Sequence, residues 1–451
     1  MSTHNGAPRL SPAVKKREHG HAARELGRAP VLLGISVVLC VIGFVWMTQD
    51  MVMHTLRYPD PDMAGELDGE IGGGPAKRPR SSPLPRVALM FLTRGPMPLE
   101  PIWREFLEGD PAGGGVHWSE LFALHTHPAP GYEYPPASIF HGTEVAGRRR
   151  VVWGEHSVVT AERALIRAAL VSPSTMRFLL ASETCVPLWS RATLYLNLMS
   201  RQRSEINTCR DLKSKQEAQQ HMAFRYSDKM GLYGVKRAHW RKSSQWFMLV
   251  REHAQLVAND SRVDTAFRMS CSAASRNRFC VSDEHYVPTL LTFLGRQGES
   301  TCRAGVAYAS WSGRNPSHPR TWTEEEAVPA TVARMRGPCA SNATADAWDL
   351  LRFARYVRGS VQRGRAAPPL GSPEYDFYVR DFISLTWFKP HEPICHYTAR
   401  KIAPAATAAW TRVLRPVFLG LADSPPRVAG ATPADATEVP TARAGAADPV
   451  A

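Results

Sequence analysis

Short continuous apolar runs along this chain alternate with stretches in which apolar residues recur every three or four positions. The runs Val87–Leu92 and Arg177–Ser182 have the character of strands that are buried on both faces. Apolar residues at helical spacing follow the first run over Pro98–Leu107 and precede the second over Val158–Ala169. Strand and helix alternating at these distances predict an α/β fold with a mostly parallel sheet.

The same reasoning assigns further elements and two interruptions. It predicts strands at Leu121–His125, Val151–Trp153 and Gln245–Val250, a helix at Arg251–Ala258, and polar or irregular insertions at about residues 209–222 and 346–375. The folded domain is expected over residues 86–415. The segment 416–451 is rich in Ala, Pro and Thr and is expected to be disordered.

The longest apolar run, Val31–Met47, predicts a single N-terminal transmembrane helix over residues 31–48. Basic residues lie before it and acidic residues after it, so the positive-inside rule predicts a cytosolic tail over residues 1–30 and a lumenal remainder. A cleaved signal peptide is the alternative, but a long segment precedes the run and no small-residue cleavage site follows Trp46-Met47. Residues 49–85 have the Pro-, Gly-, Asp- and Ser-rich composition of a flexible stem.

The net charge of +14 raises the question of nucleic acid binding. The basic residues are scattered, however, and apart from Arg148–Arg150 they form no stripe interleaved with aromatic residues. We therefore expect no nucleic acid partner.

The cysteines and two sequons are consistent with a lumenal domain. Cys40 lies in the predicted anchor, which leaves seven of the eight cysteines as disulfide candidates in an oxidising compartment, with at least one unpaired or intermolecular. Asn259 and Asn342 each begin an N-glycosylation sequon, which predicts a glycoprotein.

Polar residues follow the buried run Arg177–Ser182 directly, beginning with Glu183. Ligands bind outside the carboxyl ends of the strands in open α/β sheets, so Glu183 is a candidate binding residue. The alternative is a carboxylate at a helix N-terminus that accepts hydrogen bonds from local amides.

A second acidic site, Asp283-Glu284, comes just before the apolar run Val287–Leu291. A glutamate at such a position can take a proton from a sugar hydroxyl as a general base. The alternative is structural: Ser282 followed by acids is an N-cap pattern, which contributes about 1 kcal/mol to helix stability.

Three further features bear on chemistry. The pair Arg400-Lys401 is either a solvated face or a clamp for a diphosphate. Trp311 is either a core tryptophan or an aromatic surface on which a sugar ring stacks. An Asp-x-Asp motif for a divalent metal occurs only at Asp60–Asp62 in the stem, and His125 and His127 lack an evident third ligand, so we predict neither a catalytic metal nor another cofactor.

Seven blocks, taken in order, resemble glycosyltransferase family 14, the core-2/I-branching β-1,6-N-acetylglucosaminyltransferases, and especially their plant and algal relatives. The blocks are Val87–Pro96, Val152–Gly154 with Ala161–Arg163, Ser182–Leu188, Trp240–Phe247, Asp283–Thr289, Trp311 with His318-Pro319, and Ala399–Lys401. They extend from about residue 86 to about residue 405, and together they are specific for the family.

The resemblance implies a GT-A-like nucleotide-sugar-binding domain, a UDP-sugar donor with GlcNAc as the expected sugar, inversion at the anomeric carbon, no metal, and a Golgi protein anchored as a single-pass type II membrane protein. Glu284 falls on the position of the family's catalytic base. Lys401 falls on a basic residue that contacts the donor diphosphate, with Arg400 beside it, and Trp311 falls near a tryptophan that contacts the acceptor. Substrate-binding roles are implied for Glu183, Gln245, Trp246 and Asp283.

Two other classes stay open at this point. One is a non-catalytic lumenal glycan-binding protein that retains the fold, although the presence of Glu284 and Lys401 favours an enzyme. The other is a basic nucleic-acid or membrane-surface protein, which would need a cytosolic or nuclear domain. The insertion at 209–222 replaces an acceptor-binding region of the family, so the acceptor glycan is left open.

Overall fold

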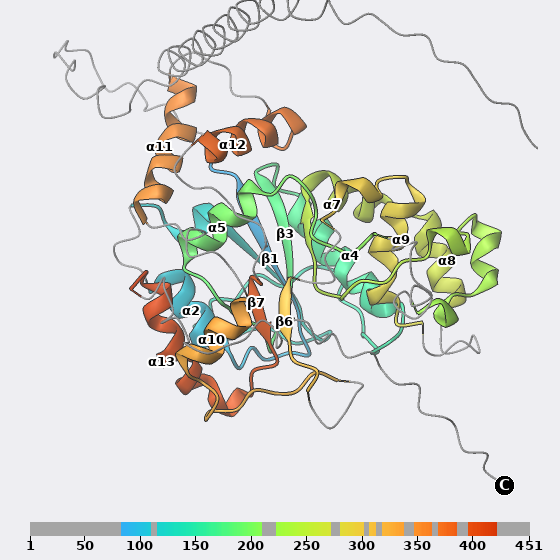
Figure 1. Ribbon diagram of the computed structural model, residues 1–451, viewed down its shortest axis with the longest axis horizontal. Coiled ribbons are helices and arrows are strands. Elements are labelled where there is room, and N and C mark those ends of the chain that lie inside the picture. Colours follow the sequence, from blue (N-terminus) through green and yellow to red (C-terminus); the bar gives the residue numbers. More distant parts are fainter. Residues whose placement is uncertain are drawn as a thin grey trace, which may run out of the picture. The chain divides into compact units, whose positions relative to one another are not determined.

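The computed structural model describes residues 83–109, 115–209, 222–271, 280–301, 306–312, 318–337, 347–362, 369–385 and 396–421 (Figure 1). The predicted cytosolic tail, the predicted anchor and the predicted stem up to residue 82 lie outside these ranges. Within them, no helix is both long enough and apolar enough to span a bilayer.

A four-stranded sheet in the order β2-β1-β3-β5 lies at the centre of the domain. β1 (Arg86–Leu92) runs parallel to both of its neighbours, β2 (Phe122–His127) and β3 (Thr175–Ser182). β5 (Met248–Val250) pairs with β3 in the antiparallel direction. The predicted mixed α/β fold with a mostly parallel sheet is therefore confirmed, with β5 shorter than expected.

The strand predicted at Val151–Trp153 does not form. Val152 and Trp153 are exposed in a loop, where they do not pack into the core. Three apolar residues in a row are therefore a surface feature here, which a short run alone does not distinguish from a buried strand.

A second, three-stranded sheet has the order β4-β7-β6. β7 (Thr398–Arg400) runs parallel to β6 (Ala307–Ala309) and antiparallel to β4 (Val186–Pro187). It brings the C-terminal part of the domain against the segment that follows β3. Parallel strands have their carboxyl ends at one edge, so the residues after β6 and after β7 begin at the same edge of this sheet.

Helices pack on both sides of the central sheet (Figure 1). α4 (Ser157–Leu170) and α7 (Arg251–Asn259) pack together on one side, as the helical spacing of their apolar residues predicts. α5 (Arg191–Ser200) contacts β1 and β3, and α2 (Glu100–Glu108) packs against α13 (Thr407–Phe418). The expected domain end at residue 415 falls inside α13, whose Leu414, Val417 and Phe418 are buried.

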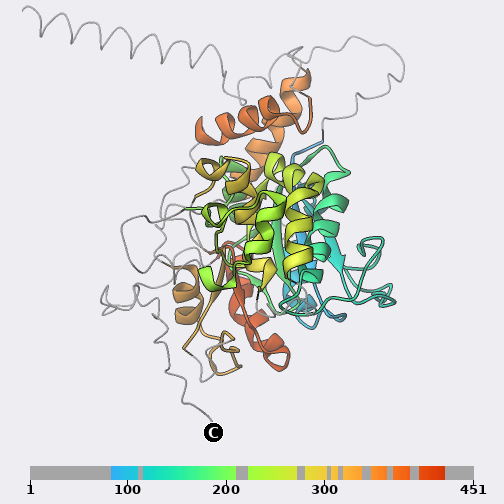
Figure 2. The ribbon, with the colours of Figure 1, turned by 90° about the vertical axis from the view of Figure 1, so that its right-hand side faces the viewer.

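Two helices, α8 (Arg262–Ser270) and α9 (Tyr286–Phe293), pack together beside α7 and face the viewer in Figure 2. The described residues also contain α3 (Trp118–Leu121), α10 (Pro329–Arg336) and the 3-10 helices η2 (Ala223–Arg225), η3 (Asp228–Tyr233), η4 (Arg237–His239), η5 (Ser282–Glu284), η6 (Gln297–Glu299) and η8 (Pro404–Ala406).

Most of the stretch 347–375 that the structure describes is helical, which contradicts the irregular structure expected there; whether the stretch is an insertion stays a prediction. α11 (Ala347–Gln362) and α12 (Pro373–Leu385) are helices that contact α5. Leu350, Phe353, Ala354 and Val357 are buried at helical spacing, and this apolar stripe explains why α11 forms despite its polar composition. The insertion expected at 209–222 lies mostly outside the described residues.

Candidate active site

Three cations from the ends of two strands lie around Glu183. Glu183 is in the turn after β3, Arg94 follows β1, and Lys401 follows β7 together with the last β7 residue, Arg400. Arg94 Nε is 3.9 Å from Glu183 Oε1, and Glu183 interacts electrostatically with all three cations. We call Arg94, Arg400 and Lys401 the cation half of the site. Glu183 is in a turn, so it is not the helix N-terminal carboxylate of the structural alternative.

Burial and the repulsion between like charges both shift pKa values in the cation half. Burial lowers the pKa of Lys401, and the neighbouring charges of Arg400 and Arg94 lower it further. Burial also lowers the pKa of Arg400. Burial raises the pKa of Glu183 despite the three cations nearby. A bound anion would relieve the repulsion among the cations, so this part of the site favours an anionic ligand.

Glu284 is half-buried and paired with two cations from other segments. Arg225 Nη1 in η2 donates a hydrogen bond of 2.8 Å to Glu284 Oε2, and Lys242 Nζ is 3.5 Å from the same oxygen. Its side chain is 24% exposed, so a substrate hydroxyl can reach it. Both cations pair with the same carboxylate oxygen and hold the Glu284 side chain in place.

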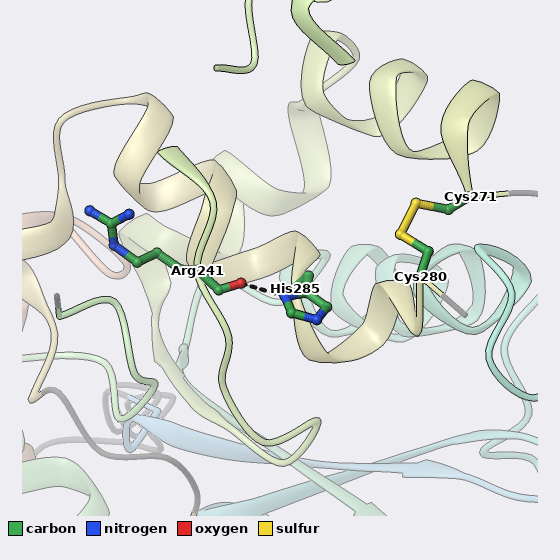
Figure 3. Close-up of a disulfide and its surroundings, with 4 residues drawn as sticks. All are labelled: Arg241, Cys271, Cys280 and His285. Atoms are coloured by element: carbon green, nitrogen blue, oxygen red, sulfur yellow. Dashed lines mark hydrogen bonds between the residues drawn. A yellow bond between two sulfur atoms is a disulfide. The ribbon is translucent and has the colours of Figure 1, made fainter. Parts of the chain in front are cut away.

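Glu284 is held by a network that does not include an N-cap. η5 ends at Glu284 and α9 begins at Tyr286, and the Ser282 side chain does not cap either helix, so the structural reading of Ser282 is wrong. His285 is buried and its Nδ1–H donates to the Arg241 carbonyl at 2.6 Å (Figure 3). Ser243 N donates to the Glu284 carbonyl at 2.9 Å, which fixes the loop before β5 against η5.

A disulfide between Cys271 and Cys280 joins the end of α8 to the residues just before η5 (Figure 3). Val281, between this disulfide and η5, has a φ of 45°, an unusual backbone conformation for a β-branched residue. Such outliers are found at functional sites more often than elsewhere. Cys209 is also disulfide-bonded, and Cys185 is a free buried thiol, in agreement with the prediction that at least one cysteine stays unpaired.

Two more carboxylates lie behind Glu284. Asp283 and Glu162 of α4 are only 8% and 2% exposed, and their charges interact. Gln245 Nε2 donates to Glu162 Oε1 at 3.0 Å. Burial, followed by the nearby charge of Glu284, raises the pKa of Asp283 to about 7. We call Glu162, Asp283 and Glu284 the base half of the site.

Trp246 connects the two halves. It is buried, and the Arg400 guanidinium lies over its ring at 4.4 Å from the ring centroid. The preceding residue, Gln245, bonds to Glu162. Asp283 is close enough to favour the charged form of Arg400. The predicted site residues Glu183, Gln245, Trp246, Asp283, Glu284, Arg400 and Lys401 therefore form one continuous cluster.

Trp311 lies just beyond the carboxyl end of β6, at the edge from which Lys401 continues. It is 48% exposed, so it is not the core tryptophan of the structural alternative. His125 and His127 lie two residues apart on β2, and burial lowers the pKa of both, that of His125 to about 4. Among the described residues no group of three or more His, Cys, Asp or Glu side chains is arranged to hold a metal ion.

Of the two sequons, Asn259 is exposed at the end of α7, and Asn342 lies outside the described residues.

Sequence reasoning assigned no role to Arg94, Glu162, Arg225 or Lys242. Glu162 carried a usable signal, because it is a carboxylate on the same helical face as Val158 and Ala169, where a buried residue is expected. Arg225 carried none, since its contact with Glu284 joins residues far apart in the sequence.

An α/β domain with a mostly parallel sheet, and with charged residues at the carboxyl ends of its strands, fits a GT-A-like glycosyltransferase domain, since ligands bind at this edge in open α/β sheets. The model of the core-2/I-branching enzyme family matches residues 87–336. The chain is also 31% identical over 287 residues to "Glycosyltransferase BC10" of Oryza sativa subsp. japonica, an alignment that covers 56% of this chain and 67% of the rice protein. The chain therefore belongs to the core-2/I-branching enzyme family and is a glycosyltransferase, which implies a nucleotide-sugar donor and a glycan acceptor.

Proposed function

We propose that this glycosyltransferase transfers GlcNAc from a UDP-sugar to a hydroxyl of a glycan or glycoprotein. The transfer inverts the anomeric carbon and needs no metal ion. The observation that carries the proposal is the pairing of a cation half with a base half, linked through Trp246. A sugar nucleotide combines a diphosphate with a reactive anomeric carbon, and the two halves match these two parts.

The reaction is a single in-line displacement. Glu284 removes the proton of the acceptor hydroxyl as that oxygen forms a bond to the anomeric carbon, and the bond from this carbon to the diphosphate oxygen breaks. One displacement inverts the configuration of the anomeric carbon. General-base catalysis of this kind contributes roughly 10²- to 10⁴-fold to the rate.

The leaving UDP gains negative charge as its bond to the sugar breaks. Lys401 and Arg400 stabilise this charge, and Arg94 is close enough to share in it. Cations preorganised at the place where charge develops stabilise the transition state more than the ground state. In this proposal they take the part that a divalent metal plays in other nucleotide-sugar enzymes.

The test is a panel of UDP-sugars offered to the purified full-length protein, with donor hydrolysis and transfer to glycan acceptors measured in parallel. UDP-GlcNAc is expected to give the highest rate, and EDTA is expected to leave the rate unchanged. A strict requirement for manganese would contradict the role given to the cation half. The rival function is a non-catalytic glycan-binding protein, and detectable glycan binding with neither hydrolysis nor transfer would favour it.

The location is part of the proposal. The apolar run at residues 31–48 and the basic residues before it support a single-pass type II protein of the Golgi membrane with a lumenal catalytic domain. A shift in gel mobility on deglycosylation that is lost in Asn342→Gln or Asn259→Gln would support lumenal exposure. A protein that is fully accessible to cytosolic protease in intact vesicles would contradict it.

A further inference from the structure

The base half contains two buried carboxyl groups that the displacement mechanism does not use. Glu162 Oε2 and Asp283 Oδ1 are both shielded from solvent, and neither has a hydrogen-bond partner among the described residues. An unpaired buried carboxylate oxygen is costly, and two adjacent negative charges are more so. A proton retained by the two carboxyl groups removes one of the two charges and so lowers both costs.

We propose that Glu162 and Asp283 form a proton-sharing pair behind Glu284, and that the ionisation of Asp283 within this pair sets the strength of Glu284 as the base. Both residues act through Glu284 and are positioning residues. The inference rests on the proposed function, since it assigns the base role to Glu284.

The positions of Asp283 and Glu162 explain how the charge on this pair acts on Glu284. Asp283 is the neighbour of Glu284 in η5, and η5 packs against α4, which carries Glu162. Gln245 holds the other Glu162 oxygen, Oε1, at 3.0 Å. The pair is thus fixed from two sides, by α4 and by the loop that also carries Trp246.

The charged groups that face Asp283 come from several elements. Glu284 is on η5 itself, Arg225 is on η2, Lys242 is in the loop before β5, and Arg400 is on β7. The other ionisable side chains on the packed helices are directed elsewhere. On α4, Arg163 pairs with Asp264 and Arg167 donates to the Ala258 carbonyl; beside η5, Tyr286 donates to Asp260 and His285 to the Arg241 carbonyl.

Ionised Asp283 places a second negative charge next to Glu284. Repulsion between the two favours transfer of the acceptor proton onto Glu284 in the transition state, because that transfer removes one of the charges. The reaction is therefore faster when Asp283 is ionised. Its pKa of about 7 places this change in the neutral range.

Infrared spectroscopy tests the proton itself, without any need for catalysis. Difference spectra of the full-length protein on either side of pH about 7 should show the carbonyl band of a buried protonated carboxyl group, and the pH-dependent part of that band should be absent in Asp283→Asn. No such band in the wild-type protein below this pH would overturn the proposal. If the band is present but the wild-type protein transfers no sugar, the pair stands and the proposed function fails.

The pH dependence of kcat tests the effect on the base. In the wild-type protein, kcat should rise about tenfold through pH about 7, and in Asp283→Asn this rise should be absent. Glu162→Leu removes the donor to ionised Asp283 and should move the midpoint up by about one pH unit, whereas Glu162→Gln restores a donor and should return it toward the wild-type value.

Two outcomes would overturn this part of the proposal. One is an unchanged rise in kcat in Asp283→Asn, and the other is the same midpoint in Glu162→Leu and the wild-type protein. Glu108→Gln, an exposed carboxylate on α2, controls for the loss of one charge. If Glu162→Leu does not fold, Asp283→Asn and Glu162→Gln still decide the matter.

Discussion

Burial acts in opposite directions on the base half and on the cation half of the site. In the base half it raises the pKa of Asp283, which favours a neutral acid. In the cation half it lowers the pKa of Lys401, which favours a neutral amine. Burial thus makes the charged form of Asp283 and the charged form of Lys401 less stable than they are in water. A ligand of complementary charge lowers the free energy of each half.

The two halves match the charge distribution of the displacement. In the transition state the anomeric carbon is positive and the departing diphosphate is negative. In the proposed mechanism, the base half stabilises the positive charge at the anomeric carbon and the cation half stabilises the negative charge on the diphosphate. The Arg400 guanidinium lies over the Trp246 ring, and this contact holds Arg400 within the cation half. The comparison predicts that damage to each half changes a different kinetic constant.

The largest effect is expected for Glu284→Gln, which removes the base and nearly preserves its shape. We expect kcat to fall about 10²- to 10⁴-fold with the KM for the donor little changed, because the diphosphate contacts remain. Steady-state kinetics with the purified protein measure both constants. Transfer near the wild-type rate, in a variant that unfolds at the wild-type temperature, would show that Glu284 is not the base.

Lys401→Met is expected to act mainly through the donor. Loss of one charge-assisted hydrogen bond to the diphosphate should lower kcat/KM by roughly 10- to 100-fold, and calorimetry should show weaker UDP binding. Lys229→Met removes an exposed lysine of η3 and is the matched control. UDP affinity that is equal in Lys401→Met and the control would remove Lys401 from the cation half.

The fold was predictable where one local signal determined it. β1 and β3 are continuous apolar runs, and α4 and α7 have clear helical spacing, so pattern alone located them. α11 was missed because its apolar stripe is sparse and becomes meaningful only when α5 packs against it. Such tertiary contacts are absent from the sequence pattern.

The site residues also divide into those that the sequence pointed to and those that it did not. Glu284 and Lys401 were predicted because they lie in blocks that resemble a known family. Arg225 escaped prediction because it reaches Glu284 from a distant segment that has no motif. The Ser282 N-cap failed because the backbone at Val281 turns into the left-handed region and starts a 3-10 helix, so α9 begins later than the pattern suggests.

Glu183→Gln sharpens the comparison, since Glu183 is a carboxylate that interacts with all three cations of the cation half. Removing its negative charge makes the cation half more positive, so UDP is expected to bind roughly three- to tenfold more tightly at low ionic strength. Glu133→Gln, an exposed glutamate, is the control for a general change in charge. Weaker UDP binding would instead show that Glu183 contacts the donor directly.

The smallest effect is expected for Trp311→Ala, which affects neither half. Trp311 is half-exposed beyond β6, and loss of sugar stacking at such a site costs about 1 kcal/mol. The KM for the acceptor should therefore rise roughly fivefold, while donor hydrolysis stays at the wild-type rate, because the proposed donor contacts come from the residues at the end of β7. Phe377→Ala removes an exposed aromatic residue of α12 and is the matched control. A large fall in thermal stability in Trp311→Ala alone would give Trp311 a packing role, and an unchanged acceptor KM would place the acceptor elsewhere.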